Sequence, residues 1–194
     1  MIELSEIIER FESALQRAED EGLYLPNGAS LATVGPGGAP SSRVVLLKGA
    51  DEKGFVFYTN LESRKARELR ENPKASLCFW WPSLEQQVRV EGEVQPVGDA
   101  QADAYWETRP RGSQIAAWAS RQSDPLSSRE ELEGEFQRLE REYAGRVVPR
   151  PPFWSGFCLV PVRIEFWTGH ENRLHERELY TRAKDGWRKT LLNP

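Results

Sequence analysis

The chain has 194 residues, of which 39% are hydrophobic and 29% charged, and its formal net charge is −4 at pH 7. This length fits one large domain or two small ones and suffices to bury a substantial core. An acidic chain does not bind nucleic acid by bulk electrostatics, and no apolar run approaches the length of a membrane span. Residues 1–30 hold seven acids against two arginines, whereas bases gather at 43–48, 64–70 and 173–189, which favours a small anionic ligand.

Cys78 and Cys158 are the only cysteines, and neither belongs to a CxxC pattern. Both lie in apolar, strand-like runs, so we expect buried free thiols in a reducing, cytoplasmic compartment. The first ten residues, MIELSEIIER, are acidic and amphipathic, unlike a signal or transit peptide. His170, His175 and the two distant cysteines make a poor metal site, so no metal is expected.

The elements before residue 98 are a helix, a run of strands and a second, short helix. Ser5 is expected to cap a helix over residues 5–19, whose apolar residues fall on one stripe. Residues 63–72, SRKARELREN, predict a short helix that Pro73 ends. Strands, separated by turns rich in Gly and Pro, are expected at 30–34, 41–50, 54–60, 74–82 and 85–97.

The second half of the chain combines helices with a final group of strands. Residues 99–107 predict a helix, and residues 109–123, RPRGSQIAAWASRQS, are expected to be irregular. Residues 128–145 predict the clearest helix, with Ser128 and Glu131 as a capping box. An extended connector over 147–154 follows, and strands are then expected at 156–167, 173–182 and 187–192.

These elements show strands joined by short turns without βαβ alternation. The pattern predicts a mainly β fold, an antiparallel, Greek-key-like barrel with peripheral α-helices, rather than a doubly wound parallel sheet. Fewer than fifty residues follow the Pro-rich connector, so a single domain over residues 1–194 is expected.

Ser63, Arg64 and Lys65 suggest an anion site at a helix start. With Ser63 as the N-cap, Arg64 and Lys65 fall in the first turn, where each cation opposes the helix dipole by about 0.3–1 kcal/mol. A bound anion makes the two cations favourable at this position. Free N–H groups, a hydroxyl and two cations would together bind a phosphate. Solvated basic side chains are the alternative, and the nearby Arg43 and Lys48 favour the phosphate.

Two further basic stretches can be interpreted in two ways. RPRGS, residues 109–113, follows a predicted helix that bears Tyr105; Arg, Tyr and Ser are common phosphate ligands and equally common loop residues. In NRLHER, residues 172–177, three basic side chains share one face if the stretch is a strand. That face fits a charged edge strand and fits equally a site with a proton-exchanging His175 and anion-binding arginines.

Long runs of the sequence resemble the pyridoxamine 5′-phosphate oxidase family. The resemblance covers nearly the whole chain from about residue 28. The matching runs are, in order, SSRVVLLKGADEKGFVFYTNLESRKARELRENP, LEQQVRVEG, YWETRPRGSQIAAWASRQS, FWSGF and IEFWTGHENRLHERELYTR. The resemblance implies an FMN-binding split β-barrel that works as a homodimer, with FMN at the subunit interface. It also implies an oxidase of vitamin B6 metabolism, which converts pyridoxamine or pyridoxine 5′-phosphate to pyridoxal 5′-phosphate by hydride transfer from C4′ to FMN N5, with O2 as acceptor.

The resemblance further implies roles for individual residues. Positions that correspond to FMN contacts in the family are Arg43, Val44, Val45, Leu46, Leu47, Lys48, Tyr58, Thr59, Arg64, Lys65, Gln87, Gln122, Ser123, Trp167 and Arg177. Positions that correspond to contacts with the substrate phosphate are Lys48, Tyr105, Arg109 and Ser113. Arg173 and His175 correspond to residues that face the substrate ring and form the catalytic pair, and Leu174 corresponds to a further substrate-binding position.

Two alternatives to this function stay open. A sister flavin oxidase of the phenazine-biosynthesis type is also similar in its RLHER stretch, although such proteins tend to lose the lysine that stands here as Lys48. A non-catalytic protein that binds flavin or pyridoxal phosphate is the second alternative. Oxygen uptake during turnover separates an enzyme from a carrier, and substrate preference separates the two oxidases.

Overall fold

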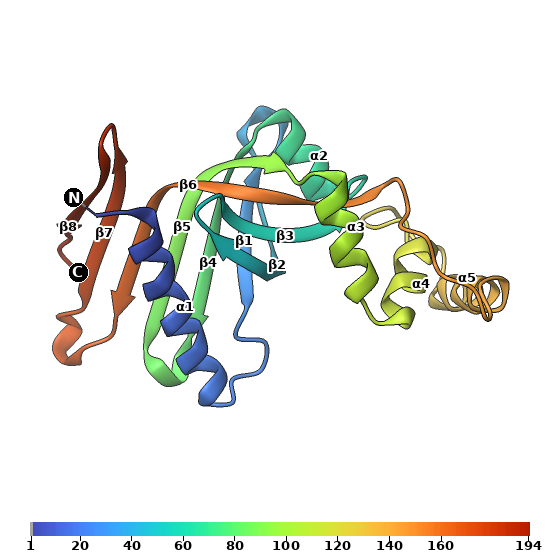
Figure 1. The fold of residues 1–194 in the computed structure, drawn as a ribbon, viewed down its shortest axis with the longest axis horizontal. Coiled ribbons are helices and arrows are strands. Elements are labelled where there is room, and N and C mark those ends of the chain that lie inside the picture. The colour runs from blue at the N-terminus through green and yellow to red at the C-terminus, as the bar shows by residue number, and fades with distance from the viewer. Residues whose placement is uncertain (1) are drawn as a thin grey trace.

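A computed structural model describes residues 2–194, which form eight strands and five α-helices (Figure 1). The strands are β1 (Gly28–Val34), β2 (Pro40–Asp51), β3 (Gly54–Asn60), β4 (Lys74–Trp81), β5 (Gln86–Pro96), β6 (Trp154–Thr168), β7 (Glu176–Ala183) and β8 (Gly186–Leu191). The helices are α1 (Leu4–Asp20), α2 (Arg64–Glu71), α3 (Asp99–Thr108), α4 (Arg111–Ala119) and α5 (Arg129–Glu142). None of the helices within residues 2–194 has the length and apolar character that a membrane span requires.

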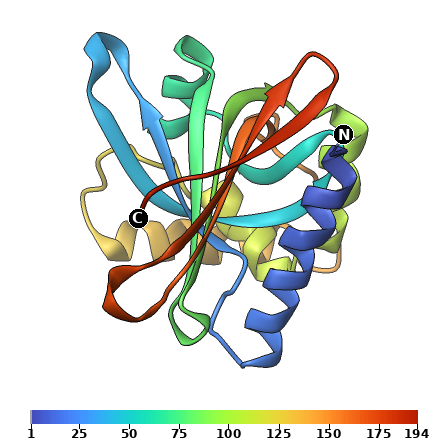
Figure 2. The same ribbon diagram turned by 90° about the vertical axis from the view of Figure 1, so that its left-hand side faces the viewer.

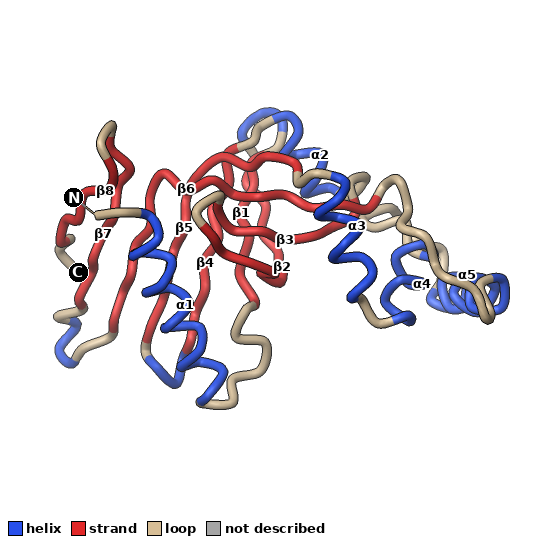
Figure 3. Tube along the Cα trace, in the orientation of Figure 1, coloured by secondary structure: helices blue, strands red, loops and turns tan. Residues whose placement is uncertain are grey.

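The strands form one antiparallel sheet in the order β3-β2-β1-β4-β5-β6-β7-β8. β3 also pairs with β6, so strands β1 to β6 close into a barrel, and β7 and β8 extend the sheet beyond it. Figure 3 shows that the helices lie around these strands, with α3, α4 and α5 together at one end of the molecule. The structure therefore confirms the predicted mainly β, antiparallel barrel with peripheral helices.

β6 is the strand at which the barrel splits. One edge of β6 pairs with β5 almost throughout, whereas the other edge pairs with β3 over residues 154–159 and with β7 over residues 163–168. Between these two segments stands Pro161, which has no N–H to donate, and the register against β5 shifts there opposite Gly92. The β7–β8 hairpin therefore leaves the barrel as a separate flap of sheet, which lies nearest the viewer in Figure 2.

Two apolar clusters hold the fold together. In the barrel, the ring of Phe11 from α1 is fully buried and contacts Phe55 and Phe79 edge-on, at centroid distances of 5.1 and 4.9 Å. A smaller cluster joins the C-terminal helices to the barrel and contains Trp106, Ile115, Leu139, Val148 and Trp154. Because Trp154 is the first residue of β6, this cluster fixes the helices α3, α4 and α5 to one end of that strand.

The prediction that residues 109–123 are irregular was wrong. Residues Arg111–Ala119 form α4, with Pro110 at its N-cap. The Pro-Arg-Gly sequence at its start conceals a helix whose body, QIAAWA, is rich in alanine, the strongest helix former. At the first helix the predicted cap was also wrong, because Glu3 rather than Ser5 is the N-cap and forms a reciprocal capping box with Glu6.

The strand predicted over residues 173–182 begins only at Glu176. Thr168 and Glu176 are the last pair between β6 and β7, so residues 169–175 must reverse the chain. Asn172 and Arg173 do this with φ angles of 56° and 61°, in the left-handed region. Arg173, His175 and Arg177 consequently do not share the face of one strand, contrary to the prediction.

We predict that Gly92 tolerates no side chain. A Cβ at residue 92 would lie 2.0 Å from the carbonyl oxygen of Val160, so the backbone of β5 or β6 would have to move. We expect Gly92→Ala to lower the free energy of unfolding by about 1–3 kcal/mol, which urea denaturation measures. The control is Gly134→Ala in α5, where a Cβ meets nothing within 4 Å and better helix propensity favours the alanine. Equal stability of Gly92→Ala and the wild type would contradict the prediction.

Candidate functional site

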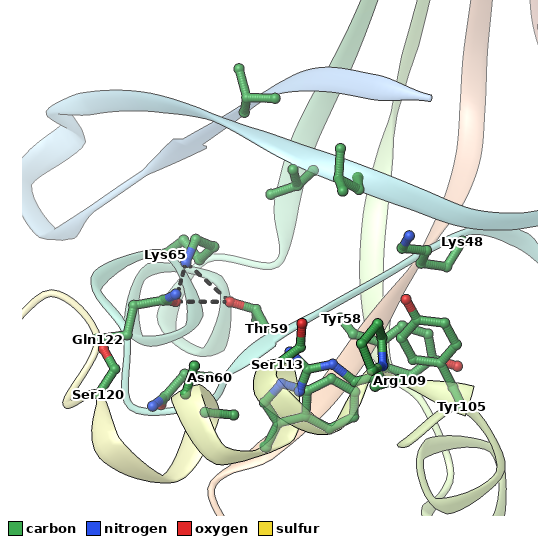
Figure 4. A pocket seen from close by; sticks show the side chains of 17 residues that line it. Lys48, Tyr58, Thr59, Asn60, Lys65, Tyr105, Arg109, Ser113, Ser120 and Gln122 are labelled. Atoms are coloured by element: carbon green, nitrogen blue, oxygen red, sulfur yellow. Dashed lines mark hydrogen bonds between the residues drawn. The ribbon is translucent and has the colours of Figure 1, made fainter. Parts of the chain in front are cut away.

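A cavity of about 520 Å³ lies between β2 and β3 on one side and α3 and α4 on the other (Figure 4). Its volume suits a cofactor or another small ligand. We call it the β2–α4 cavity. The residues predicted for the site that line it are Val44, Val45, Leu46, Lys48, Tyr58, Thr59, Lys65, Tyr105, Arg109, Ser113 and Gln122. Lining residues that the sequence did not single out are Asn60, Pro110, Ala116, Ala117, Ser120 and Trp154.

Lys65, in the first turn of α2, occupies one end of this cavity (Figure 4). Its Nζ donates to Gln122 Oε1 at 2.7 Å, to Thr59 Oγ1 at 3.0 Å and to Ser63 Oγ at 3.2 Å. Burial, and then the positive charge of Arg43, lower the pKa of Lys65 to about 8. Within residues 2–194 no carboxylate pairs with Lys65, so this end of the cavity is suited to an anion.

Two other bases of this region are already paired with Glu68. Arg64 Nε donates to Glu68 Oε1 at 2.8 Å, and Arg43 Nη2 lies 3.2 Å from Glu68 Oε2. Although burial raises the pKa of Glu68, hydrogen bonds from Ser41, Thr33 and Arg64 lower it to about 2. Glu68 is therefore a carboxylate at neutral pH, and it fixes both arginines.

The anion site predicted at residues 63–65 is thus only partly assembled in this structure. Lys65 lines the cavity, but the guanidinium of Arg64 turns to Glu68 and stays largely exposed. The Ser63 hydroxyl does not cap α2; it is buried and donates to the carbonyl of Asn60 at 2.7 Å. Ser123 lies beside this turn, where its hydroxyl accepts the backbone N–H of Arg64 at 3.1 Å.

The opposite end of the cavity is a stack of aromatic rings between two cations. Tyr58 stacks on Tyr105 with centroids 4.1 Å apart and on Trp154 with centroids 5.4 Å apart. Lys48 Nζ lies 5.8 Å from the centroid of Tyr105, and Arg109 Cζ lies 4.6 Å from that of Trp154. The ring faces attract both cations and hold them at this end of the cavity.

Arg109 has no anionic partner among the described residues, although much of its side chain is buried. Its Nη1 is buried without a hydrogen-bond partner within residues 2–194, and burial lowers the pKa of the guanidinium. Such a group is costly unless an anion meets it. Arg109, Lys48, Tyr105 and Ser113 together make a donor set for a second anion, at some distance from Lys65 (Figure 4).

α4 forms one wall of the cavity, and the sequence analysis predicted neither this helix nor its place in the site. Ser113, Ala117 and Ser120 recur at i, i+4 and i+7, the spacing of one helical face, and all three line the cavity. Their small side chains leave room beside β3. This spacing was the signal that could have predicted both the helix and its role.

A second group of predicted residues lies on a different face of the molecule. Gln87 pairs directly with Trp167, and Trp167 pairs directly with Arg177, across β5, β6 and β7. Directly paired residues project from the same face of a sheet, so we call these three the sheet-face row. Trp80 on β4 pairs with Gln87, so it lies on the same face, and it is 50% exposed.

The loop between β6 and β7 places Arg173, Leu174 and His175 next to this row. The His175 ring lies against the indole of Trp167, with centroids 4.6 Å apart, and its Nδ1 accepts the backbone N–H of His170 at 3.2 Å. In the neutral imidazole Nε2 then carries the proton and is a donor. Leu174 is 71% exposed and Arg173 is also exposed.

The fold of this chain does not bring the two groups of predicted residues together. Trp154 in the β2–α4 cavity and Trp167 in the sheet-face row are both in β6, and the strand path between them is about 40 Å long. In Figure 1, α3 and α4 lie toward one end of the long axis and β7 toward the other. Of the remaining predicted residues, Leu47 packs in the barrel core and Arg43 is bound to Glu68.

Two family models together match most of the chain. The model described as pyridoxamine 5′-phosphate oxidase matches residues 15–142, and the model described as pyridoxine 5′-phosphate oxidase C-terminal dimerisation region matches residues 154–194. The pyridoxine/pyridoxamine 5′-phosphate oxidase of Myxococcus xanthus (strain DK1622) is 57% identical over 187 residues, which cover 96% of this chain and 91% of that protein. The protein of the same name from Rubrobacter xylanophilus is 58% identical over 184 residues, covering 95% and 83%.

Solved structures give the same picture of the fold. PhzG from Burkholderia lata 383, in complex with tetrahydrophenazine-1-carboxylic acid, matches with a TM-score of 0.93 at 35% identity, covering 98% of this chain and 93% of that chain. An FMN-binding protein related to pyridoxamine 5′-phosphate oxidase from Nostoc punctiforme matches with a TM-score of 0.77 at 21% identity, covering 96% of each chain. The second match supports the split-barrel fold alone.

We predict that Lys65 makes anion binding in the cavity dependent on pH. Because its pKa is about 8, Lys65 loses its proton as the pH rises through that value. Affinity for a phosphate monoester, a dianion throughout, should fall about tenfold between about pH 7 and about pH 9.5. Calorimetric titration measures this affinity. Lys65→Arg keeps its charge over the whole range and should remove the dependence; a wild-type affinity that stays constant with pH would refute the prediction.

Proposed function

The chain belongs to the pyridoxamine 5′-phosphate oxidase family and is an enzyme, and we propose that it oxidises pyridoxamine or pyridoxine 5′-phosphate to pyridoxal 5′-phosphate with FMN as cofactor. Overall, the amine, O2 and water would give pyridoxal 5′-phosphate, ammonia and H2O2. The observation that carries this proposal is the β2–α4 cavity with a cationic donor set at each end. FMN and the substrate each carry one phosphate, so two such sets are what this pair of ligands requires.

The donor set at Arg109 would hold the substrate phosphate. Its guanidinium is half-buried and without a counter-ion in the described chain, and Lys48 adds a second positive charge across the Tyr105 ring. The hydroxyls of Tyr105 and Ser113 complete the set of donors. A doubly charged phosphate would offset the desolvation of Arg109, which a neutral ligand would not.

The donor set at Lys65 would hold the FMN phosphate, with Thr59 and Gln122 as neutral partners. Arg43, Arg64 and Ser123 stand directly behind it, and residues 44–46 of β2 would form the wall along the flavin. The chemistry that FMN supplies when bound is acceptance of a hydride and delivery of the electrons to O2. The protein would bind FMN and the substrate, orient them toward each other and stabilise their charges.

The sheet-face row would complete the site from a second protomer. Trp167, Arg173, His175 and Arg177 all lie within the region that the dimerisation-region model matches, which supports a homodimer. Exposed apolar side chains occur on both groups, with Val44 at 69% and Leu174 at 71% exposure, and a partner surface would cover them. We propose that the partner's Gln87, Trp167 and Arg177 contact the flavin of this cavity.

Arg173 and His175 would then face the substrate ring from the partner side. The Nε2–H of His175 and the guanidinium of Arg173 are donors that can hold the polar edge of the pyridine ring and direct C4′ toward the flavin. The contact of His175 with Trp167 fixes the plane of its ring. Neither residue needs to be an indispensable acid or base, since orientation supplies much of the rate.

The second candidate function is an oxidase of the phenazine type. The fit to PhzG favours it, because that structure covers nearly the whole chain. The ligand in that complex is a carboxylic acid without a phosphate, whereas this cavity presents Lys48, Tyr105, Arg109 and Ser113 as one donor set. That donor set and the names of the relatives at 57% and 58% identity make the B6 substrate the stronger candidate.

We predict that pyridoxamine 5′-phosphate bleaches the flavin absorbance of the FMN-loaded protein without oxygen. The double variant Arg173→Ala/His175→Ala should bind FMN normally but reduce it at least about tenfold more slowly, because the substrate ring loses its orienting donors. Stopped-flow absorbance measures the rate of flavin reduction in the wild type and in the double variant. If the flavin band persists with this substrate but bleaches with tetrahydrophenazine-1-carboxylic acid, the phenazine-type function holds. Persistence with both indicates a carrier, and a fully active double variant refutes the roles of Arg173 and His175.

A further inference from the structure

Glu165 is a buried carboxylate on the same sheet face as the sheet-face row. It stands two residues before Trp167 in β6, so both side chains project to the same side of the sheet. Its direct pairing partners are Arg89 on β5 and Leu179 on β7. Only 3% of Glu165 is exposed, and a carboxylate is almost never so buried unless it is paired.

The two carboxylate oxygens of Glu165 are not used equally. Oε1 accepts a hydrogen bond from Arg177 Nε at 2.8 Å. Oε2 lies 3.1 Å from Arg89 Nη2 but has no aligned hydrogen bond within residues 2–194. The directed interaction of Glu165 is therefore the one with Arg177.

Arg177 is held at a second atom as well. Its Nη1 donates to the backbone carbonyl of Asn193 at 3.0 Å, and its own carbonyl accepts the N–H of Leu192 at 2.9 Å. With Nε and Nη1 engaged in this way, Nη2 is the nitrogen that can meet a ligand in front of the sheet. The side chain is 27% exposed, so the guanidinium is fixed but still reachable.

We infer that Glu165 is a positioning residue that acts through Arg177 by aiming its guanidinium out of the sheet toward the flavin bound in the partner protomer. The inference rests on the proposed function, which assigns Arg177 to FMN. An arginine side chain held in place before binding loses less conformational entropy when the ligand arrives. A hydrogen bond at Nε also sets the plane of the guanidinium, which a charge nearby would not do.

The test measures FMN affinity and flavin reduction in the full-length protein with Glu165→Gln, Arg177→Lys and both together. Glutamine keeps the size of Glu165 and removes its charge. Lysine keeps the charge of Arg177 but lacks the planar guanidinium whose Nε the carboxylate of Glu165 holds. We expect Glu165→Gln to weaken FMN binding about tenfold, measured by quenching of flavin fluorescence. The double variant should bind FMN no more weakly than Arg177→Lys alone, because Glu165 acts through that arginine.

Glu91→Gln is the matched control. Glu91 lies on the same face and contacts Arg89 and Arg163, but it does not contact Arg177. It should keep wild-type FMN affinity. Thermal unfolding would reveal whether Glu165→Gln folds. If it does not, Glu165→Asp replaces it: aspartate keeps the charge but is shorter by one methylene, and it should weaken FMN binding in the same way.

Wild-type FMN affinity in folded Glu165→Gln would overturn the inference. Additive losses in the double variant would do so too, because they indicate a structural role that is independent of Arg177. Failure of the proposed function looks different: the wild type would bind FMN but pyridoxamine 5′-phosphate would not reduce it. In that case too, the FMN affinities of the variants would show whether Glu165 positions Arg177 for FMN binding.

Discussion

The division of one edge of β6 between two partner strands is the constraint on which the rest of this structure depends. The first half of β6 pairs with β3 and closes the barrel, and the second half pairs with β7 and opens a flap. Pro161 and Gly92 mark the switch, where the backbones approach too closely for a side chain. Because β6 runs from Trp154 in the β2–α4 cavity to Trp167 in the sheet-face row, the same strand sets the two groups of site residues apart.

Charge pairing distinguishes the bases that a buried carboxylate already holds from those that have no carboxylate partner among residues 2–194. Arg43 and Arg64 are fixed by Glu68, and Arg177 is fixed by Glu165, so buried carboxylates neutralise and orient these three arginines. Lys65 and Arg109 have no carboxylate partner in the part of the chain that the structure describes, and burial lowers the pKa of both. Two cations held in this state, at opposite ends of one cavity, are the physical basis for proposing two phosphorylated ligands.

The sequence allowed prediction of the barrel more fully than of the site. In the strand predicted at 85–97, Val88, Val90 and Val94 alternate with polar residues, a pattern typical of a strand with one buried face, and the structure buries all three. The alanine-rich body of α4 was hidden by the proline and glycine that precede it. The left-handed Asn172 and Arg173 broke the strand expected there, and no periodicity reports a loop of that kind. Resemblance to the family supplied the site residues, but not their separation into two groups, because that depends on which strands pair along β6.

Complementation between two inactive protomers tests the composite site most directly. One protomer would carry Lys48→Ala and Arg109→Ala in the β2–α4 cavity, and the other Arg173→Ala and His175→Ala beside the sheet-face row. Each homodimer should be nearly inactive as an oxidase. Co-expressed and randomly paired protomers should recover about a quarter of the wild-type sites, because each mixed dimer contains one intact cavity facing one intact row. Mixed dimers that form but recover no activity would contradict a site shared between two protomers.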